Sequence, residues 1–100
     1  MVGGISPWKN QLDFIKVAKK ILEKRTNVNF YVFGDIVSKY YFDLINNERE
    51  KCFLKEQIMF EGFKKDIPKL FDTIDITLHK IRVESFGRVL IESNASSVPV

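Results

Sequence analysis

Cysteine and histidine are almost absent from this sequence, which contains one of each, Cys52 and His79. A single cysteine cannot form an internal disulfide bond, so we interpret Cys52 as a helix-packing residue of a protein in a reducing cytoplasm. One cysteine and one distant histidine also give no cluster of metal ligands. These absences exclude a disulfide-stabilised scaffold and a zinc site as the basis of the fold.

Long apolar runs and a strong excess of one charge are missing too. No apolar stretch approaches the ~20 residues that a membrane-spanning helix needs, and no signal-peptide pattern follows Met1. The net charge is only +3, and the lysines are scattered along helical stretches. Aromatic residues fall at expected core positions instead of alternating with basic ones, so nucleic-acid binding is not expected. An apolar fraction of 45% predicts one small globular domain.

The apolar pattern alternates between strands and helices. Ser6 and Pro7 predict the start of an amphipathic helix that ends near residues 25–27. Strands are expected at 28–33, 58–61, 75–79 and from 98, and further helices at 38–55, after the cap residue Asp66, and at 87–96. Apolar strands that alternate with helices predict an α/β fold, a Rossmann-like parallel sheet with helices on both faces.

Individual residues of these elements carry their own expectations. Trp8 begins the apolar stripe of the first helix and is expected to pack there rather than stack on a base. Cys52 and Phe53 are expected to form an apolar cluster on the second helix, which the pair Asn46–Asn47 could interrupt. His79 ends an apolar strand, either as a core histidine or as a contact at the edge of a pocket.

Both ends of the sequence resemble cuts through a longer sheet. Residues 1–4 predict the last part of a strand, and residues 98–100 predict an extended apolar segment without a cap. We therefore expect residues 1–100 to form a single, partial domain of a larger protein.

The segment 84–92, with the sequence ESFGRVLIE, is the most informative one. Glu84 and Glu92 flank the start of the last expected helix, where free backbone N–H groups and the helix dipole attract anions. Such a site suits a nucleotide sugar, because phosphates accept from N–H groups and hydroxyls donate to carboxylates. By spacing alone, Glu92 is better explained as an exposed partner of Arg88, and Glu84 as an ordinary loop acid near a helix start.

Several stretches, in this order, resemble the retaining glycosyltransferases of family 4, also called group 1 glycosyltransferases. They are residues 2–10, 30–35, 58–63, 66–68, 84–92 and 98–100. The resemblance extends along nearly all of the sequence but covers only the middle of the C-terminal, donor-binding domain of the two-domain GT-B fold.

The resemblance implies a role for each matching residue. Glu84, as the catalytic residue, would accept hydrogen bonds from the hydroxyls of the donor sugar, and Glu92 would hold the ribose. Lys9 would neutralise phosphate charge. The diphosphate would bind the backbone N–H groups at Phe86, Gly87, Arg88 and Val89.

Glycines complete the donor-binding set that the resemblance implies. Gly62 and Phe63 would border the base, and Gly34 would lie close to the nucleotide. Gly4 stands where many family members carry an arginine that also binds phosphate, so Lys9 would act alone or with help from Arg88. The loop 79–83 lacks the proline and serine that are common there.

The function that the resemblance implies is sugar transfer from a nucleotide-diphospho-sugar to an acceptor, without a metal ion or other cofactor. Acceptor binding would belong to an N-terminal domain that is missing here, and the fragment alone would be inactive. We expect a cytoplasmic protein without a transmembrane segment. Peripheral association of the full enzyme with a membrane is compatible with these expectations.

Two other functions fit the same strand–helix pattern. A non-catalytic α/β remnant that serves as a protein-interaction module is the main alternative, and Gly4 in place of arginine favours it. A receiver-like signalling domain would need clustered acids at the end of its first strand, where this sequence has Gly3–Gly4. Nucleotide binding that depends on Glu92 separates the first alternative from a transferase.

Overall fold

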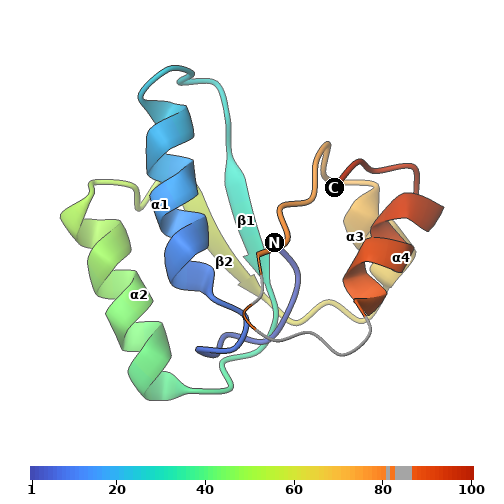
Figure 1. The fold of residues 1–100 in the computed structure, drawn as a ribbon, viewed down its shortest axis with the longest axis horizontal. Coiled ribbons are helices and arrows are strands. Elements are labelled where there is room, and N and C mark those ends of the chain that lie inside the picture. The colour runs from blue at the N-terminus through green and yellow to red at the C-terminus, as the bar shows by residue number, and fades with distance from the viewer. Residues whose placement is uncertain (81, 83–86) are drawn as a thin grey trace.

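The structure is a computed structural model that describes residues 1–80, 82 and 87–100. Helices and strands alternate along the described chain except for its last two elements, which are both helices (Figure 1). In order they are α1 (Gln11–Leu22), β1 (Phe30–Phe33), α2 (Lys39–Lys51), β2 (Ile58–Gly62), α3 (Ile67–Phe71) and α4 (Arg88–Ala95).

The sheet is built around β1. Its residues pair in parallel with β2, with Phe30 opposite Ile58, and the register shifts after Val32 so that Phe33 lies opposite Gly62. On the other edge of β1, Val2 forms a parallel bridge to Phe33. Residues 1–5 therefore form a third parallel line of the sheet, as expected for the end of a strand.

Side chains of β1 alternate between two cores. Phe30 and Val32 join a cluster with α1 and α2, which includes Ile15 and Ile45. Tyr31 and Phe33 belong to a second cluster, formed with the helices on the other face: its members from these helices are Ile67, Leu70, Phe71 and Val89. Because successive strand residues point to opposite faces, this division shows that helices cover both faces of β1.

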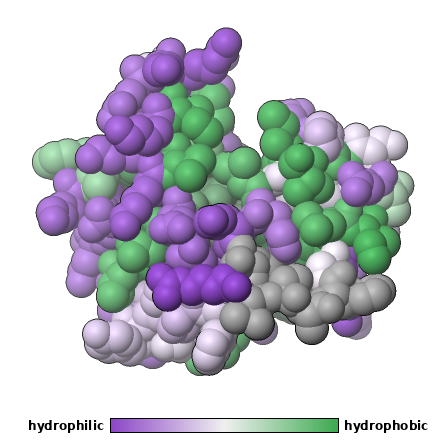
Figure 2. Space-filling model, viewed as in Figure 1, coloured by the Kyte–Doolittle hydropathy of each residue, from purple (hydrophilic) through white to green (hydrophobic). Residues whose placement is uncertain are grey.

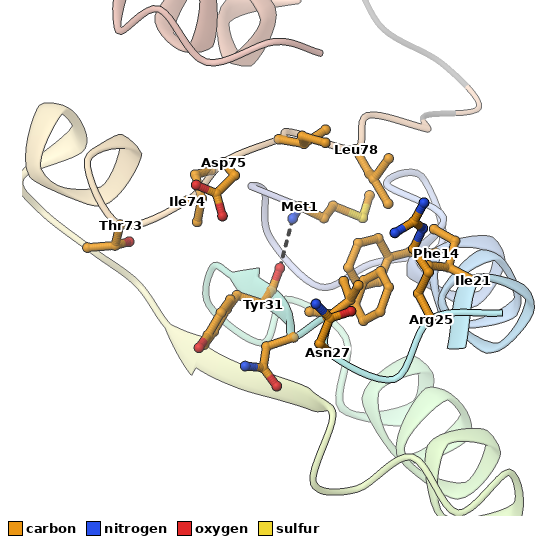
Figure 3. A pocket seen from close by; sticks show the side chains of 14 residues that line it. Met1, Phe14, Ile21, Arg25, Asn27, Tyr31, Thr73, Ile74, Asp75 and Leu78 are labelled. Carbon is orange, nitrogen blue, oxygen red and sulfur yellow. Dashed lines mark hydrogen bonds between the residues drawn. The ribbon is translucent and has the colours of Figure 1, made fainter. Parts of the chain in front are cut away.

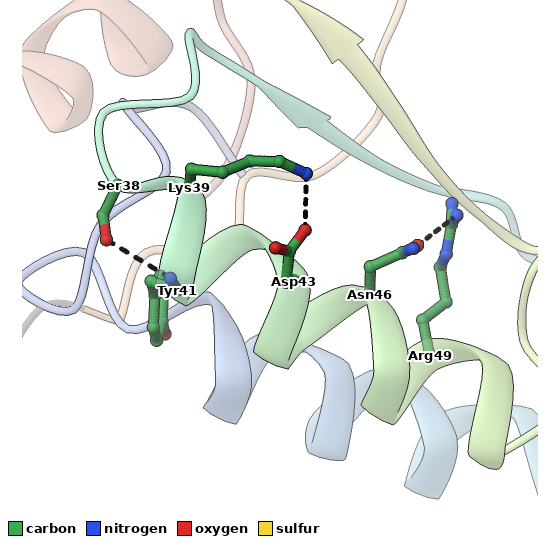
Figure 4. A network of polar contacts seen from close by, with 6 residues as sticks. All are labelled: Ser38, Lys39, Tyr41, Asp43, Asn46 and Arg49. Atoms are coloured by element: carbon green, nitrogen blue, oxygen red, sulfur yellow. Dashed lines mark hydrogen bonds and ion pairs between the residues drawn. The ribbon is translucent and has the colours of Figure 1, made fainter.

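Two helices begin where the sequence predicts. At the start of α2, the hydroxyl of Ser38 accepts a hydrogen bond from the backbone N–H of Tyr41 at 3.2 Å, and at the start of α3, Asp66 accepts from the N–H of Lys69 at 3.1 Å. Figure 4 shows the polar contacts along α2, which continues without interruption past Asn46 and Asn47. Local side-chain caps are sufficient to position these two helix starts.

The predicted start of α1 is wrong. Ser6 and Pro7 lie in a turn, and the helix begins only at Gln11. Asn10, directly before the helix, adopts a left-handed backbone conformation with φ 57°. A residue in this conformation cannot continue a helix, so the turn and the helix remain separate elements.

The two last expected strands are also absent as regular strands in the described chain. Residues 75–79 and 98–100 lie beside one another, and the N–H of Thr77 donates to the carbonyl of Pro99 at 2.8 Å. A strand requires a ladder of such bonds with its neighbours. This one contact aligns the two segments without forming a ladder.

Two aromatic side chains expected in the core are exposed. Trp8 is 66% exposed because it lies in the turn before α1 and not on the apolar face of the helix. Phe53 is 90% exposed. It follows the end of α2 with φ 59°, which turns its side chain away from the helix. Cys52 is half-buried against the first core, which confirms its interpretation as a packing residue.

Burial of the Met1 amino group makes stability depend on pH. The amine donates a hydrogen bond to the Tyr31 carbonyl at 2.7 Å, and burial lowers its pKa from 8.0 to about 5. Between these values the unfolded chain binds a proton that the folded chain does not, so stability falls as the pH falls. For the 100-residue chain with a free amino terminus, we expect the free energy of unfolding to drop by up to about 4 kcal/mol from pH 8 to pH 5.

Urea denaturation at several pH values measures this drop. Acetylation of the amino terminus is the matched control, because the acetylated chain has no amine to protonate. The difference between the two chains isolates Met1 from every other titrating group. Equal pH profiles would contradict the prediction.

Candidate functional site

Glycines bring the three lines of the sheet together where β1 and β2 end. A Cβ atom added to Gly34 would lie 2.1 Å from the backbone oxygen of Gly3. On its other side, the N–H of Gly34 donates to the carbonyl of Gly62 at 2.8 Å. Gly3, Gly34 and Gly62 therefore lie in a row across this edge, which we call the glycine edge.

The glycine edge is open at Gly62. A Cβ atom built there meets nothing within 4 Å, and the residue has φ 73°. The following residue, Phe63, is 65% exposed. Gly62 and Phe63 are expected to border a ligand, and they lie at a part of the described surface that has free space in front of Gly62.

Val37 covers Gly4 at the same edge. A Cβ atom at Gly4 would lie 2.7 Å from a methyl group of Val37, which itself is 71% exposed. A longer side chain at position 4 therefore requires Val37 to move, and its exposure leaves it room to do so. Val37 thus lies beside the glycine that stands where many family members carry an arginine.

Lys9 lies against the glycine edge. Its aliphatic carbons approach Gly3, and a Cβ atom there would lie 3.4 Å from Cδ and 3.6 Å from Cε. The residue is half-buried and precedes Asn10, so the expectation that it lies in the first turn of a helix is wrong. The turn, and not the helix dipole, sets the position of this lysine.

Gln11 holds that turn in place. The side chain is fully buried, and its amide group donates to the carbonyl of Gly4 at 2.9 Å and accepts from the N–H of Ser6 at 3.4 Å. Sequence reasoning missed this positioning residue. The available signal is its place in the apolar stripe of α1, three and four positions before the buried Phe14 and Ile15.

Tyr41 closes the start of α1. Its hydroxyl accepts a hydrogen bond from the backbone N–H of Leu12 at 2.9 Å, and burial raises the pKa of the phenol, with the bond to Leu12 acting in the opposite direction. One of the first amide groups of α1 is thus occupied by another part of the protein.

Helix α4 begins on the same side of the sheet as the ends of β1 and β2 (Figure 1). Gly87 precedes it with φ 70° and is buried, whereas Arg88 is exposed. Val89 packs against the second core. The first backbone N–H groups of a helix have no carbonyl partner within it, so α4 directs donors toward this side.

Ser93 fixes the rotation of α4. Its fully buried hydroxyl lies 2.8 Å from the hydroxyl of Thr77 and donates to the carbonyl of Val98 at 2.8 Å. With Ser93 directed inward, its neighbour Glu92 is half-buried at the side of the helix. Although Arg88 and Glu92 both belong to the described part of the chain, no ion pair joins them there, so simple pairing does not account for Glu92.

A backbone bond connects the turn of Lys9 with the loop that precedes α4. The N–H of Arg82 donates to the carbonyl of Trp8 at 3.1 Å. This bond places Arg82 beside the turn. Two expected site residues, Glu84 and Phe86, lie outside the described residues.

The structure brings part of the expected site together directly. Gly4, Gly34 and Lys9 meet around Gly3, and Gly62 is hydrogen-bonded to Gly34. The α4 residues lie on the same side of the sheet without a described contact to these glycines.

Among residues 1–80, 82 and 87–100, no group of three or more acids, histidines or cysteines is placed to hold a metal ion. No helix in these ranges has the length and apolar character to cross a membrane.

Comparison with known proteins identifies the family. The sequence matches the family described as glycosyl transferases group 1 over residues 1–100. The chain belongs to this family.

The curated relatives are much longer than this chain. It is 28% identical over 101 residues to the Escherichia coli UDP-Gal:alpha-D-GlcNAc-diphosphoundecaprenol alpha-1,3-galactosyltransferase, which covers 99% of the chain and 26% of that enzyme. It is 36% identical over 69 residues to an uncharacterized 41.2 kDa protein from the cps region of Klebsiella pneumoniae, covering 64% of the chain and 19% of that protein. The group 1 chain thus spans about a quarter or less of their lengths.

Solved structures show the same fold. The Anabaena protein HepE, crystallised with UDP and glucose, has a TM-score of 0.88 and 28% identity and covers 99% of this chain and 28% of its own. The C-terminal domain of a group 1 protein (LpcC) from Francisella tularensis has a TM-score of 0.87 and 26% identity, with 97% and 53% covered. S. aureus TarM, at 23% identity and a TM-score of 0.91, matches 99% of this chain and 20% of its own and supports the fold alone. These neighbours are GT-B glycosyltransferase domains, so the predicted Rossmann-like fold is confirmed.

Proposed function

We propose that this chain is the donor-binding part of a retaining glycosyltransferase and that a nucleotide-diphospho-sugar binds along its glycine edge. The observation that carries the proposal is the contact between Gly34 and Gly3, beside which the Lys9 side chain lies. Around this contact, one edge of a parallel sheet combines backbone without side chains, a cation and open space. Folds of this kind bind ligands at this edge of the sheet. The related HepE was crystallised with UDP and with UDP-glucose, which supports the choice of ligand.

The chemistry of sugar transfer explains why a cation is useful here. As the glycosidic bond breaks, negative charge grows on the departing diphosphate. Lys9 and the first N–H groups of α4 would stabilise that charge, and such electrostatic stabilisation usually contributes more to catalysis than any other single effect. We propose that these groups take the place of a divalent metal ion.

The remaining roles follow from the family resemblance. Glu84 would hold the donor sugar, Glu92 the ribose, and the open space at Gly62 and Phe63 the base. The first N–H groups of α4, from Gly87 to Val89, would bind the diphosphate. The exposed Arg88 would assist Lys9 at the phosphates, where Gly4 supplies no arginine.

The chain by itself supplies half of an active site. The acceptor would bind to an N-terminal domain, and the reaction would take place between the two domains. Enzymes lower reaction barriers by ~8 kcal/mol or more, and one half-site is not expected to achieve this, so we propose that the isolated chain binds the donor without transferring it. Its free thiol, Cys52, fits a cytoplasmic protein.

Isothermal titration tests the proposed function. UDP, GDP, ADP and their glucose conjugates are titrated separately into chain whose folding has been verified by circular dichroism. We expect heat from at least one of them, with a Kd between about 1 μM and 1 mM, as for a partial site. A folded sample that gives no heat with any of these nucleotides would contradict the proposal.

Substitution of Lys9 by alanine should weaken nucleotide binding. A hydrogen bond from a charged group contributes about 1.5–3 kcal/mol, so we expect the Kd for UDP to rise about tenfold to a hundredfold. Lys16→Ala is the matched control because Lys16 is an exposed lysine of α1. An equal effect of both substitutions would show that only net charge matters and would refute a specific role for Lys9.

A further inference from the structure

A second basic residue, Arg82, is attached to the turn that contains Lys9. Its backbone N–H donates to the carbonyl of Trp8 at 3.1 Å, and Lys9 is the next residue along the chain. Bond lengths along this path keep the Cα atoms of Lys9 and Arg82 within about 9 Å of each other. Two long basic side chains therefore begin at neighbouring points beside the glycine edge.

The turn that holds Arg82 is itself fixed by hydrogen bonds. The N–H of Lys9 donates to the carbonyl of Ser6 at 3.1 Å, and the buried side chain of Gln11 bonds to Gly4 and Ser6. These bonds give the carbonyl of Trp8 a defined position. The contacts that position Lys9 therefore also position the backbone of Arg82.

The Arg82 guanidinium acts on the start of α1. Burial raises the pKa of the Tyr41 phenol, and the charge of Arg82 is among the effects that lower it. The Tyr41 hydroxyl accepts from the N–H of Leu12 in the first turn of α1. Asp13 is the acid of this turn, but its carboxylate accepts from the side chain of Asn10 at 2.8 Å. No ion pair within the described part of the chain includes Arg82, whose side chain is exposed and accessible to a ligand.

The opposite end of the sheet offers less positive charge to an anion. A cavity of about 540 Å³ lies there, and Arg25 is the single basic side chain among its lining residues (Figure 3). Asp75, which also lines it, carries the opposite charge. The Met1 amine is mostly neutral at pH 7 because its pKa is about 5. Figure 2 shows hydrophilic surface gathered over α1 and apolar surface toward α3 and α4.

We propose that Arg82 is a second phosphate-binding residue of the donor site and replaces the arginine that many family members carry at the position of Gly4. This proposal rests on the proposed function, and its ligand is the diphosphate of the nucleotide sugar. A guanidinium presents a planar fork of donors that binds two phosphate oxygens at once. Arg82 would approach the diphosphate from the turn of Lys9, whereas Arg88 would approach it from α4.

Alanine at position 82 tests the guanidinium alone. The Arg82→Ala chain keeps the backbone N–H that bonds to Trp8, so we expect an unchanged melting temperature. Titration uses whichever of UDP, GDP and ADP binds the unchanged chain most tightly, and the Kd should rise about tenfold to a hundredfold. Lys80→Ala is the matched control, because Lys80 is an exposed lysine two positions away, and it should bind as the unchanged chain does.

An arginine returned to position 4 tests the replacement. Gly4 has no positive φ and therefore accepts a side chain. The obstacle is a Val37 methyl group 2.7 Å from the added Cβ atom, and Val37→Ala removes it. In the Arg82→Ala chain, Gly4→Arg with Val37→Ala should lower the Kd again by at least about fivefold. Gly4→Met with Val37→Ala adds comparable bulk without charge and should not.

The same pair of substitutions in the otherwise unchanged chain completes a double-mutant cycle. Gly4→Arg with Val37→Ala should improve binding less there than in the Arg82→Ala chain, because Arg82 already pairs with the phosphate charge. Equal improvement in both chains would show that the two arginines act independently and would contradict the replacement.

The remaining outcomes separate this proposal from the proposed function. If the unchanged chain binds a nucleotide and Arg82→Ala binds it equally well, Arg82 is not a donor-site residue and the proposed function stands. Equal losses in Arg82→Ala and Lys80→Ala would show that only net charge matters and would also overturn the role of Arg82. A folded, unchanged chain that binds none of the three nucleotides would overturn both.

Discussion

Replacing Gly34 by alanine is expected to destabilise the chain by about 3 kcal/mol or more. The added Cβ atom would lie 2.1 Å from the carbonyl oxygen of Gly3, which is backbone and cannot rotate away. The residue also has φ 150°, a conformation that side chains rarely adopt. Overpacking costs about 1–3 kcal/mol and backbone strain about another 1–3 kcal/mol. Urea denaturation of the two chains measures the difference.

Gly62→Ala is the matched control for this substitution. Gly62 also has a positive φ, of 73°, but the added atom meets nothing within 4 Å. We therefore expect a loss of only about 1 kcal/mol, from backbone strain alone. If both alanine variants were equally stable, the close contact between Gly3 and Gly34 would not be a determinant of this fold.

Replacing Glu92 by alanine is expected to weaken binding of the nucleotide by about tenfold to a hundredfold. A ribose hydroxyl that donates to a carboxylate forms a charge-assisted bond, and its loss costs about 1.5–3 kcal/mol. Glu92 is half-buried at the side of α4 and makes no ion pair with the described Arg88. Its removal should therefore affect the ligand more than the fold. Titration with UDP, together with a melting curve, measures both effects.

Glu50→Ala provides the control for lost charge, because Glu50 is an exposed glutamate on α2. The control should bind UDP as the unchanged chain does. A Glu92→Ala chain that binds UDP with unchanged affinity would remove Glu92 from the proposed site. If the unchanged chain bound no nucleotide at all, a protein-interaction module would become the better description.

Local sequence signals predicted the elements whose ends depend on local contacts. Asp66 caps α3 as expected, and Ser38, the first residue of the expected second helix, caps α2, because a side-chain oxygen near a helix start bonds to a backbone N–H three positions later. The β-rich runs of β1 and β2 also formed strands close to the expected residues. Both signals arise within a few residues of the chain.

Signals that depend on distant residues were not recognised. Ser6 and Pro7 predict a helix start, but the buried Gln11 bonds to Gly4 and Ser6 and keeps these residues in a turn. Residues 75–79 have the composition of a strand, but their described bond from Thr77 to Pro99 is a single contact and not a ladder. In both cases the contacts with another part of the fold decide the conformation, and a local preference does not specify them.

The sequence alone determined the family, the succession of β1, α2, β2 and α3 and the covering of the sheet by helices on both faces, because these depend on the identity and spacing of residues along the chain. Only the tertiary structure decided that Gly34 must be a glycine, that Lys9 lies along Gly3 and that Gln11 fixes the turn between them. Those facts follow from contacts between separate lines of the sheet, and spacing along the chain does not specify which backbone atoms approach one another.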